Sequence, residues 1–121
     1  MALKESLDIA GKAGIPEKKI VIDPAIGFIR NTSVPWHVWD CYVIKNLKQL
    51  HELNKPICIA LSRKSFIGKI LDLKEPEERL FGSLSATAIA VYNGAHIIRT
   101  HDVIATLQVA RLAEFIKKAS Y

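Results

Sequence analysis

The chain has 121 residues, of which 50% are hydrophobic, and a formal net charge of +5. This length allows at most one domain, and the hydrophobic fraction excludes a disordered chain. The positive charge makes nucleic acid a partner to consider. However, the cations are scattered without a run of like charges, so we do not expect a nucleic-acid partner. No apolar run reaches the ~18 residues of a membrane span, and Lys4 and Glu5 interrupt the N-terminus, so we expect neither a membrane partner nor a signal peptide.

The first half of the chain predicts two helices with a strand between them. Residues 2–13 carry a helical apolar stripe that stops at Gly14. The β-branched run within 20–25 predicts a strand from Ile20 that stops at Asp23. A second helix is expected at about 35–53, with Ser33 as its N-cap.

The second half alternates strands and helices. Five apolar residues after Pro56 predict a strand at 57–61 that is buried on both faces. The remaining expected elements are a helix at 65–71, a surface loop at 72–79 that starts a further helix, a helix of small residues at 82–92, a strand at 95–102 and a helix at 103–119. Strands that alternate with helices predict a parallel sheet with right-handed crossovers, so the expected fold class is α/β.

The two cysteines indicate a reducing compartment. Cys41 and Cys58 have neither CxxC nor CxxH spacing, and both fall inside predicted regular elements. We therefore expect a cytoplasmic protein without a disulfide framework or a zinc site.

Each predicted strand ends in polar residues. The three clusters are Asp23, then Ser62–Ser65, then Arg99–Asp102. Because the carboxyl ends of parallel strands lie on one side of a sheet, we expect these clusters to form one site. Three polar ends on three strands favour a site over packing, since charged residues are almost never buried unpaired.

Each cluster also has a simpler interpretation. Ser62–Ser65 could be a solvated basic turn, and Asp23 could cap a turn or a helix. Arg99 and Asp102 could form a plain ion pair, and His101 could be an ordinary loop histidine.

The residue types indicate the ligand chemistry. The Asp23 carboxylate only accepts, so it suits a ring edge with adjacent N–H donors. The cationic ends of the next two strands suit a phosphate or carboxylate, and barrels often bind phosphate after strands seven and eight. A ligand with a polar heterocycle at one end and a phosphate at the other would use both the carboxylate and the cationic parts of the site. No Ser-His-Asp triad is indicated, and the Gly27 loop has no GxGxxG or P-loop spacing.

Four motifs resemble, in order and spacing, the C-terminal part of dihydropteroate synthase. They are Asp23–Phe28, Ser62–Gly68, Glu78–Ser83 and Gly94–Val103. The resemblance implies a (β/α)8 TIM barrel, with residues 1–121 as the C-terminal part of one pterin-binding domain: the last three βα units, strands 6–8, preceded by a helix. It implies the condensation of 6-hydroxymethyl-7,8-dihydropterin diphosphate with p-aminobenzoate, with Mg²⁺ present and pyrophosphate released.

The resemblance implies roles for the residues at the pterin and p-aminobenzoate ends. Asp23 would accept from the pterin ring N–H groups, and Phe28 would wall that pocket. Lys64 would reach both the pterin carbonyl and the p-aminobenzoate region, where Arg63 and Ser65 would also lie.

The diphosphate would be held by Ser62, Arg99 and His101. The predicted catalytic residues are Lys64, Arg99 and His101, because cationic side chains stabilise the charge of the departing diphosphate. A pterin cation would form, and the aniline nitrogen would attack it. We expect the Mg²⁺ ligand outside this chain and no metal site within it.

The chain departs from the family pattern at three points and in length. Ala25 and Ala60 stand where the family usually has glycine, and Ile29 precedes Arg30. Each adds bulk near the pocket wall. The barrel needs roughly 250 residues, so the first five strands are missing. We expect a fragment or one chain of a split protein, inactive alone, that forms a homo-oligomer through its last helices or pairs with the missing barrel half.

Two other functions stay open at this point. The pterin-binding domain of a corrinoid-dependent methyltransferase shares the barrel and the Asp-Pro element, but it lacks an aminobenzoate site with Ser62-Arg63-Lys64. A nucleic-acid-binding module would use the basic charge and predicts steep salt dependence, but it gives no reason for Asp23 at a strand end.

Overall fold

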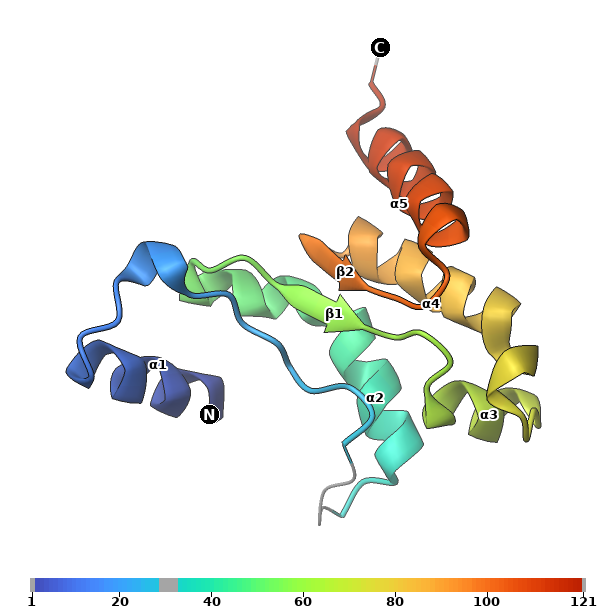
Figure 1. Ribbon diagram of the computed structural model, residues 1–121, viewed down its shortest axis with the longest axis horizontal. Coiled ribbons are helices and arrows are strands. Elements are labelled where there is room, and N and C mark those ends of the chain that lie inside the picture. The colour runs from blue at the N-terminus through green and yellow to red at the C-terminus, as the bar shows by residue number, and fades with distance from the viewer. Residues whose placement is uncertain (1, 29–32, 121) are drawn as a thin grey trace.

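A computed structural model describes residues 2–28 and 33–120 of the chain. Its elements in order are α1 (Ala2–Lys12), η1 (Glu17–Lys19), α2 (Trp36–Lys45), η2 (Leu47–Leu53), β1 (Cys58–Ala60), α3 (Ser65–Leu71), η3 (Pro76–Arg79), α4 (Leu80–Tyr92), β2 (Ile97–Arg99) and α5 (Val103–Lys118). Figure 1 shows α1 at one end of the molecule and α4 and α5 at the other. The departure predicted at Ile29 and Arg30 lies outside the described residues.

The sheet is parallel, as the sequence predicts. β1 pairs with β2 in a register that places Ile59 opposite Ile98. On its other edge β1 is preceded by an isolated parallel bridge between Ile22 and Ile57. Two backbone hydrogen bonds make this bridge, from Ile22 N–H to Pro56 O at 2.9 Å and from Cys58 N–H to Ile22 O at 2.8 Å. The α/β class is therefore confirmed.

The strand predicted from Ile20 is reduced to the bridge at Ile22, and the chain turns at Asp23, where the sequence places the strand end. Asp23 Oδ1 accepts the N–H of Ala25 at 2.8 Å, which closes a short Asx turn. Pro24 has no N–H to donate to a neighbouring strand, and Ala25 has a φ of 60°. Together these features end the extended backbone at Asp23.

The two faces of the sheet differ in burial. On the helix-covered side, Ile57, Ile59 and Leu61 are fully buried in one core cluster with residues of α2, η2, α3 and α4. On the other side, Ala60 is only half-buried and Ile97 is exposed. The prediction of a strand buried on both faces is therefore confirmed for most of β1 but wrong at Ala60, which faces a pocket.

Other boundaries also differ from prediction. β2 covers only Ile97–Arg99 of the strand expected at 95–102, and α4 begins at Leu80 instead of 82. The helix expected at 35–53 divides at Asn46, which ends α2 with a φ of −106° and a ψ of 22°, and the 3-10 segment η2 follows it. Ser33 is not its N-cap, because Pro35 takes that position without a side-chain cap. The expected surface loop at 72–79 contains η3, with a capping box between Glu75 and Glu78.

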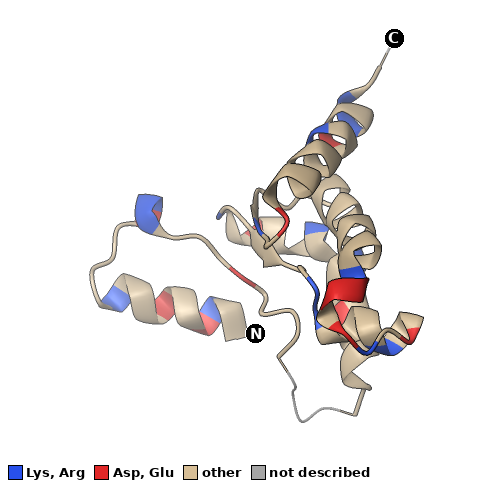
Figure 2. Cartoon of the chain, turned by 45° about the vertical axis from the view of Figure 1, so that its right-hand side comes forward, with Lys and Arg blue, Asp and Glu red and all other residues tan. Residues whose placement is uncertain are grey.

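The charge distribution agrees with the sequence analysis. Figure 2 shows Lys and Arg residues on several helices and loops of the described chain, interspersed with acidic residues. None of the helices in the part of the chain that the structure describes combines the length and the apolar character that crossing a membrane requires.

Candidate functional site

A pocket of about 350 Å³ lies at the carboxyl ends of β1 and β2 and beside the Asp23 turn. Its lining residues are Asp23, Ile26, Phe28, Ala60, Ser62, Lys64, Arg99, Thr100 and His101. The three predicted polar clusters therefore do meet. All of the candidate residues line this pocket except Arg63 and Ser65. Of the two alanines that replace glycine, Ala60 lines the pocket and Ala25 does not.

Asp23 performs the turn role that the sequence left open, and it also lines the pocket. Its Oδ1 accepts from Ala25 N–H. Ala25 holds a left-handed conformation that glycine takes freely and that costs alanine about 1–2 kcal/mol. The turn fixes where the carboxylate lies, so the two interpretations of Asp23 are compatible.

Lys64 lies across the pocket against the Gly27 loop. A Cβ added at Gly27 would stand 2.9 Å from Lys64 Cδ, and Gly27 has a φ of 91°. The Lys64 Nζ atom is 5.7 Å from the centroid of the Phe28 ring, within range of a cation–π interaction. Asp40, buried in α2, accepts from Gly27 N–H at 3.2 Å and helps to hold this loop.

Ser62 connects the end of β1 to the end of β2. Its Oγ is 2.8 Å from His101 Nδ1, and it accepts the backbone N–H of His101 at 3.2 Å. His101 is therefore a loop histidine with a defined partner, and it also lines the pocket. The pair holds two predicted diphosphate residues side by side.

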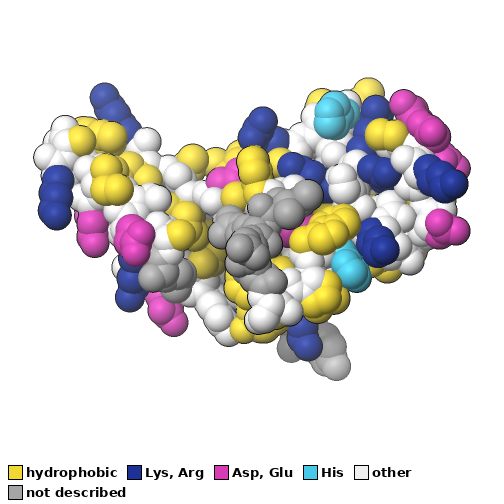
Figure 3. Space-filling model, turned by 90° about the horizontal axis from the view of Figure 1, so that it is seen from below, with side chains coloured by type: hydrophobic (Ala, Val, Ile, Leu, Met, Phe, Trp, Pro, Cys, Tyr) yellow, Lys and Arg dark blue, Asp and Glu magenta, His cyan; other side chains and the backbone are white. Residues whose placement is uncertain are grey.

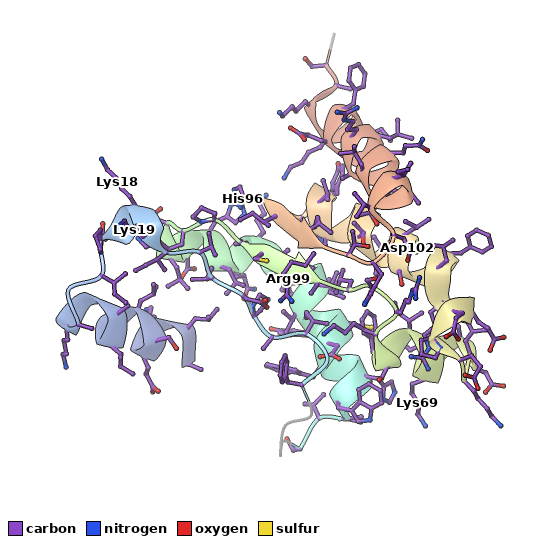
Figure 4. All side chains as sticks on the ribbon, in the orientation of Figure 1. Lys18, Lys19, Lys69, His96, Arg99 and Asp102 are labelled. Atoms are coloured by element: carbon purple, nitrogen blue, oxygen red, sulfur yellow. The ribbon has the colours of Figure 1, made fainter. Side chains whose placement is uncertain are left out.

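The simpler interpretation of Arg99 and Asp102 as a plain ion pair is not borne out. Asp102 pairs instead with Arg63, whose Nη2 lies 2.9 Å from Asp102 Oδ1. In Figure 4, Arg99 lies at the sheet and Asp102 beside the start of α5. Arg99 projects from the open face of β2 into the pocket, so Asp102 is left to the Arg63 side chain. The hydrogen bond to Asp102 and its charge raise the pKa of the Arg63 guanidinium.

Arg63 and Ser65 lie outside the pocket lining. The Arg63 side chain is engaged by Asp102, and Ser65 is the exposed first residue of α3. Of the three residues assigned to p-aminobenzoate, Lys64 alone lines the pocket as described.

Three residues close to the site were not predicted. Ser83 Oγ accepts the Arg63 N–H at 2.7 Å, and Arg79 Nη1 donates to Arg63 O at 3.0 Å. Both belong to the Glu78–Ser83 motif, which was the available signal. Burial raises the pKa of the Cys58 thiol, nearby Asp23 raises it further, and Arg99 lowers it.

No group of three or more His, Cys, Asp or Glu side chains that could hold a metal ion occurs within residues 2–28 and 33–120. On the face seen in Figure 3, Lys and Arg side chains lie in separate places among acidic and hydrophobic ones. The pocket itself places the cationic groups of Lys64 and Arg99 in one cavity with the carboxylate of Asp23.

Parallel strands that alternate with helices and end at one polar pocket define an α/β protein, and in such proteins ligands bind at the carboxyl ends of the strands. Residues 1–101 match the family model described as "Pterin binding enzyme". Because this match covers most of the chain, the chain belongs to the pterin-binding enzyme family.

Curated relatives and solved structures agree with this membership. The chain is 41% identical over 103 residues to a dihydropteroate synthase of Escherichia coli K12, which covers 85% of this chain and 34% of that protein. It is 40% identical over 114 residues to a dihydropteroate synthase of Bacillus subtilis, which covers 94% of this chain and 37% of the relative. The chain thus spans about a third of the length of the curated relatives it matches.

Two solved structures show the extent of the fold similarity. A dihydropteroate synthase of Coxiella burnetii in complex with pteroic acid is 40% identical, with a TM-score of 0.87 over 98% of this chain and 43% of that chain. One of Xanthomonas albilineans in complex with 7,8-dihydropteroate is 31% identical, with a TM-score of 0.88 over 98% of this chain and 44% of the other.

Proposed function

We propose that this chain is the C-terminal part of a dihydropteroate synthase. This transferase condenses 6-hydroxymethyl-7,8-dihydropterin diphosphate with p-aminobenzoate to dihydropteroate and pyrophosphate in folate biosynthesis. The observation that carries the proposal is the pocket, where the carboxylate of Asp23 shares one cavity with the cations of Lys64 and Arg99. The relatives named dihydropteroate synthase support it, as do the similar structures that bind pteroic acid or 7,8-dihydropteroate.

In this proposal residues 1–121 form the C-terminal part of one (β/α)8 barrel domain. They supply its last three βα units, strands 6–8, preceded by helix α1. The parallel bridge at Ile22 and the parallel pair of β1 and β2, each followed by a helix, support this assignment. The remaining strands belong to a part of the barrel outside this chain, without which we expect no catalysis.

The pterin ring lies at the Asp23 side of the pocket. The Asp23 carboxylate accepts from the ring N–H groups, because a carboxylate has only acceptor atoms to offer. Phe28 covers one ring face, and Lys64, already above Phe28, donates to the pterin carbonyl. These contacts fix the ring so that its reactive methylene carbon points toward the β2 end.

The diphosphate lies at Ser62, Arg99 and His101. Arg99 and Lys64 place positive charge where the bond between the methylene carbon and the diphosphate oxygen breaks, which stabilises the departing anion. The Ser62–His101 contact of 2.8 Å orients the imidazole toward the same anion. The aniline nitrogen of p-aminobenzoate then attacks the pterin cation and loses a proton.

The p-aminobenzoate end lies at the mouth of the pocket. Lys64 lines the pocket, Ser65 follows it at the exposed start of α3, and Arg63 stays beside them in its ion pair with Asp102. The carboxylate of p-aminobenzoate would take hydrogen bonds from Lys64 and Ser65. This arrangement makes Lys64 the residue shared by both substrates.

Mg²⁺ is implied by the family resemblance alone. The described residues do not supply a group that fits a metal ion, so we place the metal ligands in the rest of the barrel.

The proposed partners are the two substrates and a protein surface, in a cytoplasmic setting without nucleic acid or membrane. α4 and α5 line an apolar groove of about 530 Å³. Neighbouring side chains such as Phe81, Ile104 and Phe115 are exposed. We propose that a second copy or the rest of the barrel covers these helices.

Isothermal titration with 6-hydroxymethyl-7,8-dihydropterin diphosphate tests the pocket. We expect Asp23→Asn and Arg99→Ala each to weaken binding strongly. Arg111→Ala, which removes an exposed arginine of α5 away from the pocket, is the matched control and should bind as the unchanged chain does. Equal binding by all four proteins would refute the assigned site.

Activity is tested in a chimaera, because the chain spans only part of its relatives. In it, this chain replaces the matching segment of the Bacillus subtilis relative, with which it aligns over 114 residues. We expect formation of dihydropteroate that depends on Lys64, Arg99 and p-aminobenzoate. A folded chimaera that binds both substrates but forms no product would refute the proposed activity.

A further inference from the structure

The residue before Lys64 holds an unusual backbone conformation. Arg63 has a φ of 58°, in the left-handed region that residues with a Cβ atom seldom occupy. It lies in a tight turn that the Lys64 N–H closes by donating to Leu61 O at 3.3 Å. Such a conformation persists only where the surrounding structure holds it.

Two side chains, from Arg79 at the end of η3 and from Ser83 in α4, hold both backbone groups of Arg63. Ser83 Oγ accepts its N–H at 2.7 Å, and the same hydroxyl donates to Arg79 O at 2.8 Å. Arg79 Nη1 donates to the Arg63 carbonyl at 3.0 Å. The turn is therefore fixed from the α4 side through main-chain atoms.

The other guanidinium nitrogens of Arg79 also bind backbone carbonyls. Nε donates to Leu73 O at 3.0 Å, and Nη2 donates to Lys74 O at 2.8 Å. Arg79 joins no carboxylate among the ion pairs of the described residues. Its planar fork, which lysine cannot reproduce, is thus used to join the loop after β1 to the loop after α3.

Gly68 in α3 makes room for this fork. A Cβ at Gly68 would stand 2.6 Å from both Nε and Nη2 of Arg79 and 2.5 Å from Leu73 O. Backbone carbonyls and a guanidinium held at three points cannot move aside at low cost. The absence of a side chain at Gly68 is therefore a condition for the position of Arg79.

We propose that Arg79 and Ser83 are positioning residues for Lys64. They hold Arg63 in its left-handed conformation, and the turn then directs the Lys64 side chain across Gly27 toward Phe28. The consequence for catalysis rests on the proposed function, in which Lys64 serves both substrates. Neither Arg79 nor Ser83 lines the pocket, so both act through the backbone of Arg63.

The backbone part of this proposal is tested without any activity measurement. In the 121-residue chain, NMR-detected hydrogen exchange is followed at the Arg63 amide, with the Cys58 amide, which donates to Ile22 O, as the reference for opening of the sheet. We expect Ser83→Ala to speed exchange of Arg63 at least about tenfold relative to Cys58. An unchanged relative rate would overturn the proposal.

Ser85→Ala is the matched control for Ser83→Ala. Ser85 lies in the same helix and donates to the carbonyl four residues earlier, at 2.9 Å from Phe81 O, as Ser83 does to Arg79 O. It has no contact with Arg63. We expect Ser85→Ala to leave the Arg63 exchange rate unchanged. A similar acceleration in both variants would mean that the helix hydrogen bond alone matters, which also overturns the proposal.

A rescue experiment in the chimaera separates positioning from general support. Arg63→Ala and Arg63→Gly both lose the side chain that pairs with Asp102, but glycine adopts the left-handed conformation without help. Adding Ser83→Ala should lower kcat/KM about tenfold or more in the Arg63→Ala background and less than about threefold in the Arg63→Gly background. Equal losses in the two backgrounds would contradict a positioning role.

Arg79→Lys tests the fork itself and should lower kcat/KM by about tenfold to a hundredfold while the chimaera stays folded. A folded Arg79→Lys chimaera with unchanged kcat/KM would overturn the role of Arg79. Failure of the proposed function would instead show as a parent chimaera without product, while the exchange experiment still decides whether Ser83 holds Arg63.

Discussion

The two faces of the parallel sheet have different roles: one forms the core that stabilises the fold, and the other faces the candidate pocket. On the helix-covered face, Ile57, Ile59 and Leu61 are 0% exposed and belong to one apolar core cluster. On the pocket face, the same strands present Ala60 and Arg99, with Ile97 still 41% exposed. Side chains alternate along a strand, so one short strand serves both purposes. Substitutions on the two faces should therefore affect different measurements.

The largest effect should come from opening a cavity on the helix-covered face. Ile59→Ala removes a fully buried side chain and should lower the free energy of unfolding by about 3 kcal/mol. Val21→Ala is the control on the open face, where Val21 is 52% exposed and the loss should stay below about 1 kcal/mol. Urea unfolding measures both. Similar losses at the two positions would remove the distinction between the faces.

The next effect concerns ligand binding at the pocket face. Arg99→Ala should weaken binding of the dihydropterin diphosphate about 100-fold, because a charge-assisted contact to the diphosphate is lost. Arg99 has no ion pair with Asp102 to lose, so the free energy of unfolding should change little. Titration calorimetry measures the binding and urea unfolding measures the free energy of unfolding, both on the same protein preparation. A large loss of stability with intact binding would assign Arg99 to the core instead.

A pair of glycine substitutions sharpens the same division. Gly27→Ala adds a Cβ 2.9 Å from Lys64 Cδ at a φ of 91°, so it should cost about 1–2 kcal/mol and displace Lys64. Gly11→Ala in α1 meets no atom within 4 Å and should stabilise the chain by up to about 1 kcal/mol. Opposite signs in thermal unfolding are expected. Two losses, or two gains, would contradict the close approach of Lys64 to Gly27.

The smallest effect is a dependence of stability on alkaline pH. Burial raises the pKa of both thiols, with Asp23 adding to the rise at Cys58 and Asp40 at Cys41. A raised pKa in the folded state means that the stabilisation is complete below the unfolded pKa, about 8.5, and is lost as the pH rises above it. Urea unfolding at pH 7 and pH 10 should show this decline, and Cys41→Ala combined with Cys58→Ala should reduce it. An equal decline in the double variant would assign the effect to other groups.

Much of the fold was predictable because its signals are local. The apolar run before Ser62 predicts β1, and α3 begins and ends at Ser65 and Leu71 as expected. The meeting of Asp23 with the ends of β1 and β2 follows from parallel pairing alone. These inferences need only side-chain periodicity and the rule that parallel strands end on the same side.

The misses arise where one side chain competes with the backbone or with a distant partner. β-Branched residues favour a strand from Ile20, but only the bridge at Ile22 forms before the Asp23 turn, and the helix that the apolar spacing favours divides at Asn46. The pairing of Asp102 with Arg63 instead of Arg99 depends on a left-handed backbone at Arg63. An arginine in the sequence does not signal that conformation, because glycine or asparagine usually occupies a left-handed position.

The Arg79 fork has a consequence for how this region can vary among relatives. Its three partners are main-chain oxygens of Arg63, Leu73 and Lys74. Any residue at those positions offers the same carbonyl, so they can be substituted without loss of the hydrogen bonds to Arg79. The contact requires a particular residue only at two positions, an arginine at 79 and a glycine at 68. We therefore expect pairwise co-variation among aligned sequences to miss this connection, although two of its members would hardly vary at all.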